Sequence, residues 1–443
     1  MTTRQGYTDL QNLISRNRRG EKIGTYAVCS AHPSVLDAAI QQALEDGSTL
    51  HVESTSSQVN QLGGYTGQTP SQFANFVHSA AQRAGLSSQQ VLLGGDHLGP
   101  FPWRNEPANS ALEKARELVR TCVLAGYKKI HLDTSMACAD DSGPGLDEHV
   151  IATRAALLCD AAERACNELP PGSPQLLYVI GSEVPAPGGE SEPGAPPAIT
   201  PKENVNRTLE VFKKAFTERG LSATWDRVVG LVVQPGVEFG EDLVFNYDRS
   251  KACSLSSALP AHPYLVYEAH STDYQSALAL DEMVEDHFAI LKVGPWLTFA
   301  YREAIFALSV IERELLARKQ SFRLSQVRES LDAAMVANPK YWRSYYHGDE
   351  DAMRVSRAYS YSDRCRYYWH EASVQKEIQC LLSNLSTVAL PLSLISQYLS
   401  SEYEAVRNGQ LQLESEQMIL YHIRIVLRTY AKACGVRKQE GQQ

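Results

Sequence analysis

An aspartate and a histidine stand side by side where a short apolar run of the sequence ends. In "LLGGDHLGPFPW", Asp96 and His97 follow two glycines and precede a loop rich in proline and aromatic residues. A neutral histidine can hold a divalent metal, and an adjacent carboxylate can exchange a proton with a metal-bound hydroxyl. The pair therefore predicts a metal or polyol site, with a hydrogen-bonded loop as the alternative.

Further carboxylates and a second histidine also stand where apolar runs end. Two histidines and a carboxylate are a common set of metal ligands, so we expect His97, His270 and Glu183 to bind a divalent cation. For acid and base chemistry we expect Asp96 together with Glu183 or Glu268. The residue types do not distinguish Zn²⁺, Mg²⁺ and Mn²⁺.

A second group of polar residues suits the hydroxyl groups of a sugar or sugar phosphate. The run "HVESTSSQVNQLGGYTG" is rich in amides and glycines, which hydrogen-bond hydroxyls but also build ordinary turns. Lys292 has three interpretations, namely a Schiff-base nucleophile, a phosphate contact or an ion pair with neighbouring acids. The residues expected to bind substrate are Glu53, Gln58, Asn60, Asp133, Gln234, Lys292 and Gly294.

Eight short β-rich runs position these residues, and each is followed by a helical pattern. Near-continuous apolar strands that alternate with amphipathic helices predict a parallel sheet covered on both faces. Eight such units favour a (β/α)8 TIM barrel, in which active sites lie at the carboxyl ends of the strands. The runs begin at residues 24, 49, 91, 129, 176, 228, 264 and 288.

The β pattern stops near residue 300, and the remainder of the chain is helical in pattern. We expect an N-terminal lead at 1–23, the barrel at 24–316 and a helical C-terminal extension at 317–443. The aromatic and basic stretch that includes "YSYSDRCRYYW" is expected to pack on the barrel wall as a cap rather than to reach the site. The loop at 186–201 is either a lid over the site or a plain surface loop.

Composition excludes several classes of protein. The chain has 443 residues, 43% of them hydrophobic, with a net charge of −9. A basic stripe that would contact nucleic-acid phosphates is not visible, and no apolar run is long enough to span a bilayer. The nine cysteines form no CxxC pair, so we interpret them as reduced packing residues and expect a cytoplasmic protein.

Seven motifs of the sequence occur in the same order in one known family. They are "ESTSSQVNQLGGYTG", "GGDHLGPFPW", "HLDTSM", "GSEVPAPGG", "YEAHSTDYQ", "LKVGPWLTFAYREA" and "YSYSDRCRYYW". Together they resemble the accessory, so-called non-catalytic subunit of class II D-tagatose-1,6-bisphosphate aldolase. Some members of that family carry the older label tagatose-6-phosphate kinase.

This resemblance implies a TIM barrel that acts in the catabolism of galactitol, N-acetylgalactosamine or related ketohexoses. The implied partner is a class II aldolase catalytic subunit, whose activity and stability the accessory subunit supports; a homo-oligomer is the alternative assembly. A kinase activity is not expected, because the sequence contains neither a Walker loop nor a kinase glycine-rich loop.

The sequence departs from the class II aldolase pattern at two places. Gln234 in "VVQPG" stands where that family has a metal-binding histidine, so Glu183 or Glu268 would have to replace this ligand. The loop "HSTD" brings Asp273 to the position of a phosphate loop, which argues against bisphosphate binding. The retained Asp96 and His97 leave a competing hypothesis, a self-standing metal-dependent ketohexose or ketohexose-phosphate 4-epimerase or aldolase that breaks and remakes the C3–C4 bond.

Overall fold

Eight parallel strands close a barrel in the computed structural model, which describes residues 4–142, 145–185, 196–259 and 262–436. Each strand lies in one of the eight apolar runs, so the predicted (β/α)8 barrel is confirmed. A two-stranded hairpin, β7 (Glu238–Phe239) and β8 (Val244–Phe245), lies outside the barrel. The barrel strands are β1 (Thr25–Val28), β2 (Leu50–Thr55), β3 (Val91–Leu98), β4 (Lys129–Leu132), β5 (Leu177–Ile180), β6 (Val228–Val232), β9 (Val266–Ala269) and β10 (Ile290–Val293).

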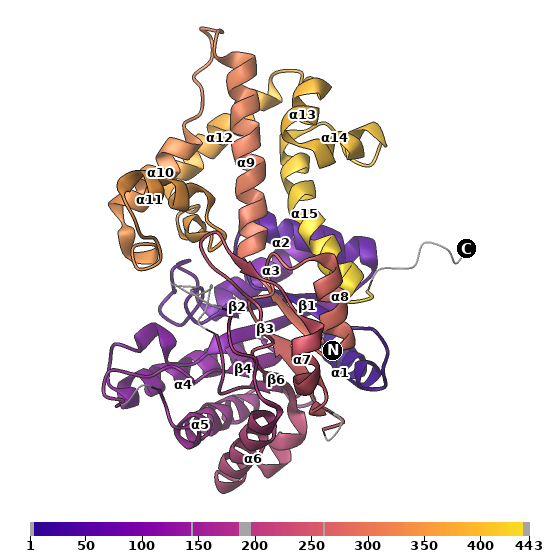
Figure 1. Cartoon of the computed structure of the whole chain (residues 1–443), viewed down its shortest axis with the longest axis vertical. Coiled ribbons are helices and arrows are strands. Elements are labelled where there is room, and N and C mark those ends of the chain that lie inside the picture. Colours follow the sequence, from indigo (N-terminus) through magenta and orange to yellow (C-terminus); the bar gives the residue numbers. More distant parts are fainter. Residues whose placement is uncertain (1–3, 143–144, 186–195, 260–261, 437–443) are drawn as a thin grey trace, which may run out of the picture.

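Amphipathic helices cover the outside of the barrel (Figure 1). In α4, apolar residues spaced three and four apart form one face, and Ala115, Leu118 and Cys122 on this face are fully buried. Gly126 follows α4 with a φ of 99°, a conformation that glycine adopts without strain. The covering helices are α2 (Pro33–Asp46), α3 (Pro70–Arg83), α4 (Ala108–Leu124), α5 (Glu148–Cys166), α6 (Lys202–Glu218), α7 (Arg249–Ser256) and α8 (Ala277–Glu285).

The N-terminal helix closes one end of the barrel. Leu10 and Ile14 of α1 (Arg4–Arg18) pack in one apolar cluster with residues of several barrel strands, among them Leu92, Leu177 and Val229. Leu92 and Val229 lie near the amino ends of their strands, so α1 seals the end opposite to the predicted site. Ligands must therefore enter from the carboxyl end.

The C-terminal helices form a second layer above the barrel. In Figure 1, α9 (Pro295–Leu316) rises from the barrel, and α15 (Ser415–Ala433) runs back beside it to contact α2 and α8. The extension thus also completes the outer ring of the barrel. The division at residues 23 and 316 stays a prediction. The other helices of the extension are α10 (Val327–Ala337), α11 (Glu350–Tyr359), α12 (Ala372–Ser386), α13 (Leu392–Tyr398) and α14 (Ser400–Arg407).

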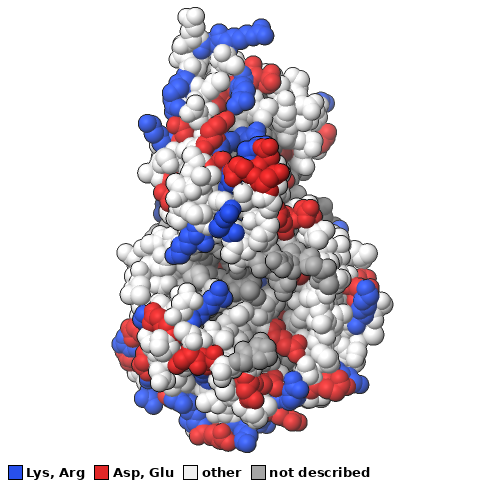
Figure 2. All heavy atoms as spheres, turned by 60° about the vertical axis from the view of Figure 1, so that its left-hand side comes forward, with Lys and Arg blue, Asp and Glu red and all other residues white. Residues whose placement is uncertain are grey.

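The surface fits the composition. Figure 2 shows basic and acidic side chains interspersed over one face of the molecule, without a basic stripe on that face. None of the described helices is both long and apolar enough to cross a membrane. All nine cysteines are free, and Cys122 and Cys159 are buried among helices as expected. The loop at 186–201, for which a lid and a plain surface loop were both left open, falls mainly on residues 186–195, which lie outside the described residues.

Candidate functional site

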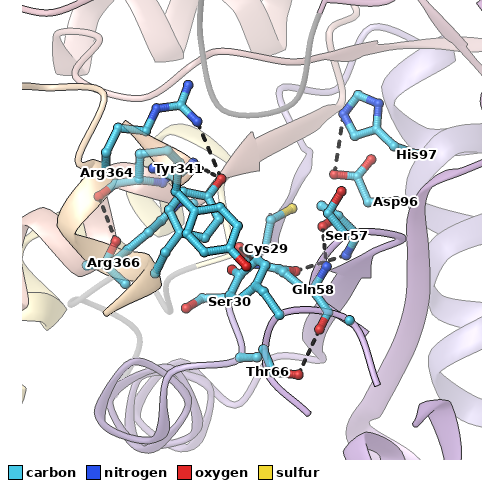
Figure 3. A pocket seen from close by; sticks show the side chains of 18 of the residues that line it. Cys29, Ser30, Ser57, Gln58, Thr66, Asp96, His97, Tyr341, Arg364 and Arg366 are labelled. Atoms are coloured by element: carbon cyan, nitrogen blue, oxygen red, sulfur yellow. Dashed lines mark hydrogen bonds and ion pairs between the residues drawn. The ribbon is translucent and has the colours of Figure 1, made fainter. Parts of the chain in front are cut away.

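A cavity of about 940 Å³ lies at the carboxyl ends of the strands. We call its barrel side the floor, formed by Asp96, His97, His270 and Lys292 with the buried groups beneath them. We call the opposite side the extension wall. Figure 3 shows Asp96 and His97 on one side of the cavity and Arg364 and Arg366 on the other. The wall residues are Lys340, Tyr341, Ser344, Tyr345, Arg364, Arg366, Tyr367, Trp369, His370 and Gln375.

A local distortion of β3 brings both Asp96 and His97 to the floor. The pairing of β3 with β4 shifts between Gly95 and Leu98, and His97 has a φ of 47°. A Cβ at position 95 would lie 2.4 Å from Leu98 Cδ1, so a larger residue there would have to displace the Leu98 side chain. Residues held in such sparsely populated conformations cluster at functional sites. Asp96 and His97 both line the cavity, as the sequence analysis predicted.

Three histidines surround the floor. The ring centroids of His97, His131 and His270 lie 4.7 to 5.2 Å apart. His97 Nε2 is 3.1 Å from His270 Nδ1, and His131 Nδ1 is 3.1 Å from Asp96 Oδ1. His97 and His270 were expected here, whereas His131 was missed.

Carboxylates hold two of these rings in place. His97 Nδ1 lies 2.7 Å from Asp133 Oδ2, which leaves Nε2 directed toward the other histidines. Burial lowers the pKa of His97, but Asp96 and Asp133 outweigh burial and raise this pKa above its ordinary value. His270 Nε2 lies 3.0 Å from Glu268 Oε1, yet burial lowers the pKa of His270 to about 4. Asp133 was expected to bind substrate, and its contacts instead orient His97.

A buried layer of ion pairs lies below the floor. Lys129 Nζ is 2.7 Å from Glu53 Oε1 and 2.6 Å from Glu268 Oε2, and all three side chains are fully buried. Lys292 pairs with Glu53 and lies 3.0 Å from Asp96 Oδ1. Burial works against charge on the Lys292 ammonium, but Asp96 and Glu53 raise its pKa well above the ordinary value. These contacts favour the ion-pair interpretation of Lys292, because a nucleophilic lysine must be deprotonated.

The floor has the ligand atoms for a metal ion. One ligand atom each from Asp96, His131, Glu268 and His270 can be chosen so that all four lie within 4.8 Å of one another. Imidazole nitrogens and carboxylate oxygens suit zinc and related divalent ions. Within this group, His131 Nδ1 lies 3.1 Å from Asp96 Oδ1 and His270 Nε2 lies 3.0 Å from Glu268 Oε1.

The charges of the floor also fit a divalent cation. Four carboxylates face two ammonium groups, so the floor keeps two negative charges while its histidines are neutral. A divalent cation balances this excess, and a proton on His97 balances half of it. The carboxylates are Glu53, Asp96, Asp133 and Glu268, and the ammonium groups are Lys129 and Lys292.

Two predicted site residues lie elsewhere. Glu183 was expected to be a metal ligand and catalytic, but its carboxylate accepts hydrogen bonds from Thr200 Oγ1 and Asn204 Nδ2, at 2.5 and 2.7 Å. Gln234 was expected to bind substrate, but its side-chain oxygen accepts hydrogen bonds from the backbone of Gly236 and Val237 and closes a turn. The structure does not bring either residue to the metal-capable group, in which His131 and Glu268 stand with His270 instead.

The amides after β2 line the cavity but are committed to the backbone. Gln58 accepts a hydrogen bond from Thr55 N and donates one to Cys29 O. Asn60 accepts hydrogen bonds from Leu62 N and Gly64 N, and a Cβ at Gly64 would lie 2.3 Å from Gln58 O. Their first role is therefore to shape the loop, the alternative that the sequence left open.

The segment 359–369 reaches the cavity, where only a packing role was expected. Arg364, Arg366, Tyr367 and Trp369 line the cavity, and Tyr367 stacks on Tyr341 with an interplanar angle of 11°. The cap and the barrel thus enclose the site together.

Comparison with known proteins identifies the family. The model of D-tagatose-1,6-bisphosphate aldolase subunits of the GatZ/KbaZ-like type matches residues 10–435. The chain belongs to the GatZ/KbaZ-like family. The predicted resemblance is confirmed, and with it an accessory-subunit family of tagatose-bisphosphate aldolase in carbohydrate metabolism.

One solved structure is similar to this chain over nearly its whole length. A protein of Sinorhizobium meliloti 1021 described as a probable tagatose 6-phosphate kinase is 42% identical, with a TM-score of 0.85 over 93% of this chain and 100% of that one. The YdjI aldolase of Escherichia coli K12 is 10% identical, with a TM-score of 0.41 over 88% of this chain and 100% of that one. Fructose-bisphosphate aldolase of Campylobacter jejuni is 13% identical, with a TM-score of 0.39 over 85% and 92%.

In this GatZ/KbaZ-like chain, an internal carboxylate fills the start of the helix after the last barrel strand. Asp273 Oδ1 accepts hydrogen bonds from the backbone N–H groups of Gly294 and Trp296, at 3.0 and 2.9 Å. Gly294 was expected to bind substrate. Its N–H is already used, as the altered loop "HSTD" suggested.

Proposed function

We propose that this chain is an accessory, ligand-binding subunit of a tagatose-bisphosphate aldolase, working with a separate class II catalytic subunit. The observation that carries the proposal, beyond the family, is the state of Asp96. Burial raises the pKa of Asp96, but His97 and Lys292 outweigh burial and hold this pKa well below its ordinary value. A carboxylate stabilised in this way is a weak base, since a catalytic base works best with a pKa near the operating pH.

The floor is suited to hold the ligand rather than to transform it. The proposed ligand is a ketohexose phosphate, whose hydroxyls can be bound by Asp96, His270 and Lys292 at the cavity surface. A divalent cation at the floor would be held by His131, His270, Asp96 and Glu268, and it would supply a Lewis acid for the C2 carbonyl. Which of Zn²⁺, Mg²⁺ or Mn²⁺ binds is part of the test below. We also propose a cytoplasmic location, with a homo-oligomer as the alternative to the mixed assembly.

One observation supports a second, less favoured candidate, a 4-epimerase. Asp96 lies at the cavity surface next to the metal-capable group. Asp96 would accept the proton of the C4 hydroxyl while the C3–C4 bond breaks and its electron pair moves to the polarised C2 carbonyl. After rotation of the released aldehyde the bond forms again on the opposite face, and Asp96 returns the proton to the C4 oxygen.

An assay with the purified chain separates the two candidates. The chain is stripped of metal, supplied with Zn²⁺, Mg²⁺ or Mn²⁺, and incubated with fructose 6-phosphate, tagatose 6-phosphate or tagatose 1,6-bisphosphate. The proposal predicts no product from the chain alone, and faster cleavage of the bisphosphate when the chain is added to a class II catalytic subunit. Metal-dependent conversion by the chain alone, abolished in a folded His97→Ala variant, would establish the epimerase instead.

A further inference from the structure

We propose that the phosphate group of the ligand is bound by Arg364 and Arg366 of the extension wall, outside the barrel. This inference rests on the proposed function, because it assumes that the cavity receives a sugar phosphate. It assigns the two ends of the ligand: the phosphate to the extension wall and the carbonyl end to the floor.

The usual phosphate position of this fold is occupied by the protein itself. TIM barrels commonly bind phosphate at the loops after the last two strands and at the N-terminus of a nearby helix. Here Asp273, which is buried, accepts the N–H groups of Gly294 and Trp296 at the start of α9. A phosphate placed there would lose these donors and face a carboxylate. The anionic end of a ligand must therefore find its donors elsewhere in the cavity.

Two guanidinium groups converge on one oxygen at the extension wall. The Tyr367 hydroxyl oxygen lies 2.9 Å from Arg366 Nη2 and 3.5 Å from Arg364 Nη1. Planar guanidinium groups fixed in this way suit the oxygens of a phosphate. Burial raises the pKa of Tyr367, yet Arg366 and Arg364 outweigh burial and lower it, which shows that negative charge is stabilised at this point.

Several neighbouring groups hold both arginine heads in position. Arg366 Nη1 donates to the backbone oxygens of Ser362 and Asp363, at 2.5 and 3.0 Å. The Arg364 guanidinium lies over the Tyr345 ring, 3.2 Å from the centroid. The nearby Asp363 carboxylate accepts a hydrogen bond from Thr298 Oγ1 at 2.6 Å. These contacts fix the two guanidinium groups at the wall of the cavity.

The charge of the extension wall has a single sign. Among its described cavity-lining residues, Lys340, Arg364 and Arg366 are cationic, and none is a carboxylate. The floor, in contrast, carries an excess of carboxylates. A phosphate is attracted to the first and repelled by the second, so the charges alone orient a sugar phosphate across the cavity. In Figure 3 the labelled arginines face Asp96 and His97 across this space.

Calorimetry on the full chain tests the assignment. Binding of tagatose 6-phosphate and fructose 6-phosphate is compared with binding of tagatose and fructose in the wild type, Arg364→Gln and Arg364→Lys. Loss of charge-assisted hydrogen bonds is expected to weaken the sugar phosphates about 10 to 100-fold in Arg364→Gln, with partial recovery in Arg364→Lys. The free sugars should bind as they do to the wild type, which also shows that the variant is folded. Arg343→Gln, an exposed arginine of the extension that does not line the cavity, is the matched control.

Three results would overturn the inference. In the first, the wild type binds the sugar phosphates and both Arg364→Gln and Arg366→Gln bind them with unchanged affinity. The arginines would then not bind the phosphate, and the proposed function would still stand. If the wild-type chain binds neither sugar phosphate, the phosphate assignment and the proposed function are both wrong. Equal losses for free and phosphorylated sugars would also count against the phosphate assignment, because they would indicate a disturbed cavity.

Discussion

The floor and the extension wall of the cavity both contain buried charge, but the excess charge of the two sides has opposite sign. In the floor, Lys129 is paired with Glu53 and Glu268 at 2.7 and 2.6 Å, and Lys292 lies 3.0 Å from Asp96. In the wall, the contacts of Arg364 and Arg366 include a phenol oxygen, an aromatic face and backbone carbonyls. The floor keeps an excess of carboxylates, whereas the charged residues that line the described part of the wall are all cationic except for the histidine His370. The difference teaches which side of the cavity attracts a cation and which side attracts an anion.

The largest expected effect comes from breaking the paired charge of the floor. Lys129→Met leaves Glu53 and Glu268 without an ammonium group that both contact. Removing one partner of a buried ion pair typically costs about 3–5 kcal/mol, so the free energy of unfolding should fall by about that amount. Urea denaturation at neutral pH measures it. Lys214→Met, which removes an exposed pair with Glu218, should change stability by less than about 1 kcal/mol, and a similarly small loss in Lys129→Met would contradict the account.

A pH-dependent effect is expected where floor and wall meet, at Asp273. Burial raises the pKa of Asp273 to about 6, above its ordinary value of 3.8. The folded protein thus holds this proton more tightly than the unfolded chain, so the stabilisation is complete below about pH 4 and is lost as the pH rises through about 6. Asp273→Asn keeps an acceptor for Gly294 N and cannot ionise. As the pH rises from about 4 to 7, the wild type should therefore lose about 3 kcal/mol of its free energy of unfolding relative to the variant.

Denaturation curves of both proteins at several pH values measure this gain. If the difference in free energy of unfolding between the two proteins is the same at every pH in this range, Asp273 is not a buried carboxyl group with a raised pKa.

A smaller effect tests how the floor orients its histidines. Asp133→Asn weakens the contact that fixes His97 Nδ1, and His97 Nε2 lies 3.1 Å from His270 Nδ1 in the metal-capable group. Changes to such supporting partners typically lower metal affinity about 10 to 100-fold. Calorimetric titration of the metal-free chain with Zn²⁺ or Mn²⁺ measures the change. Asp226→Asn, at an exposed position, serves as control. Equal affinity in the Asp133 variant and the wild type would show that His97 does not support the metal site through His270.

The smallest effect is expected at the rim of the extension wall. Lys340 lines the cavity but is exposed, so its attraction for a phosphate is screened by solvent and salt. Lys340→Gln should weaken sugar-phosphate binding about two- to fivefold at low salt, and less at high salt. A loss as large as that of Arg364→Gln, independent of salt, would move the phosphate site toward Lys340.

Much of the fold could be predicted from the sequence because its signals are local. Apolar runs alternating with amphipathic helices gave all eight strands, and the carboxyl ends of the strands gave the region of Asp96, His97 and His270. Such strand ends meet in any TIM barrel, so spacing along the chain was sufficient.

The misplaced and missed residues depend on contacts that are distant or buried. Glu183 and Gln234 stand at strand ends like the others, but neighbouring loops turn them into local hydrogen bonds. Lys129 and His131 could have been found, because charged residues at alternate positions of an otherwise apolar strand must point into the barrel and need partners there. The approach of Arg364 to the cavity joins parts of the chain far apart in sequence and left no local signal.

The account is tested most directly by titrating a class II tagatose-bisphosphate aldolase catalytic subunit with this chain. Bisphosphate cleavage and the thermal half-life of the catalytic subunit are followed, and sedimentation reports whether the two chains associate. The account predicts a complex, a rise in both quantities that saturates with added chain, and no product from this chain alone. A catalytic subunit that neither binds the chain nor changes with it, beside metal-dependent conversion of a sugar phosphate by the chain alone, would contradict the accessory role.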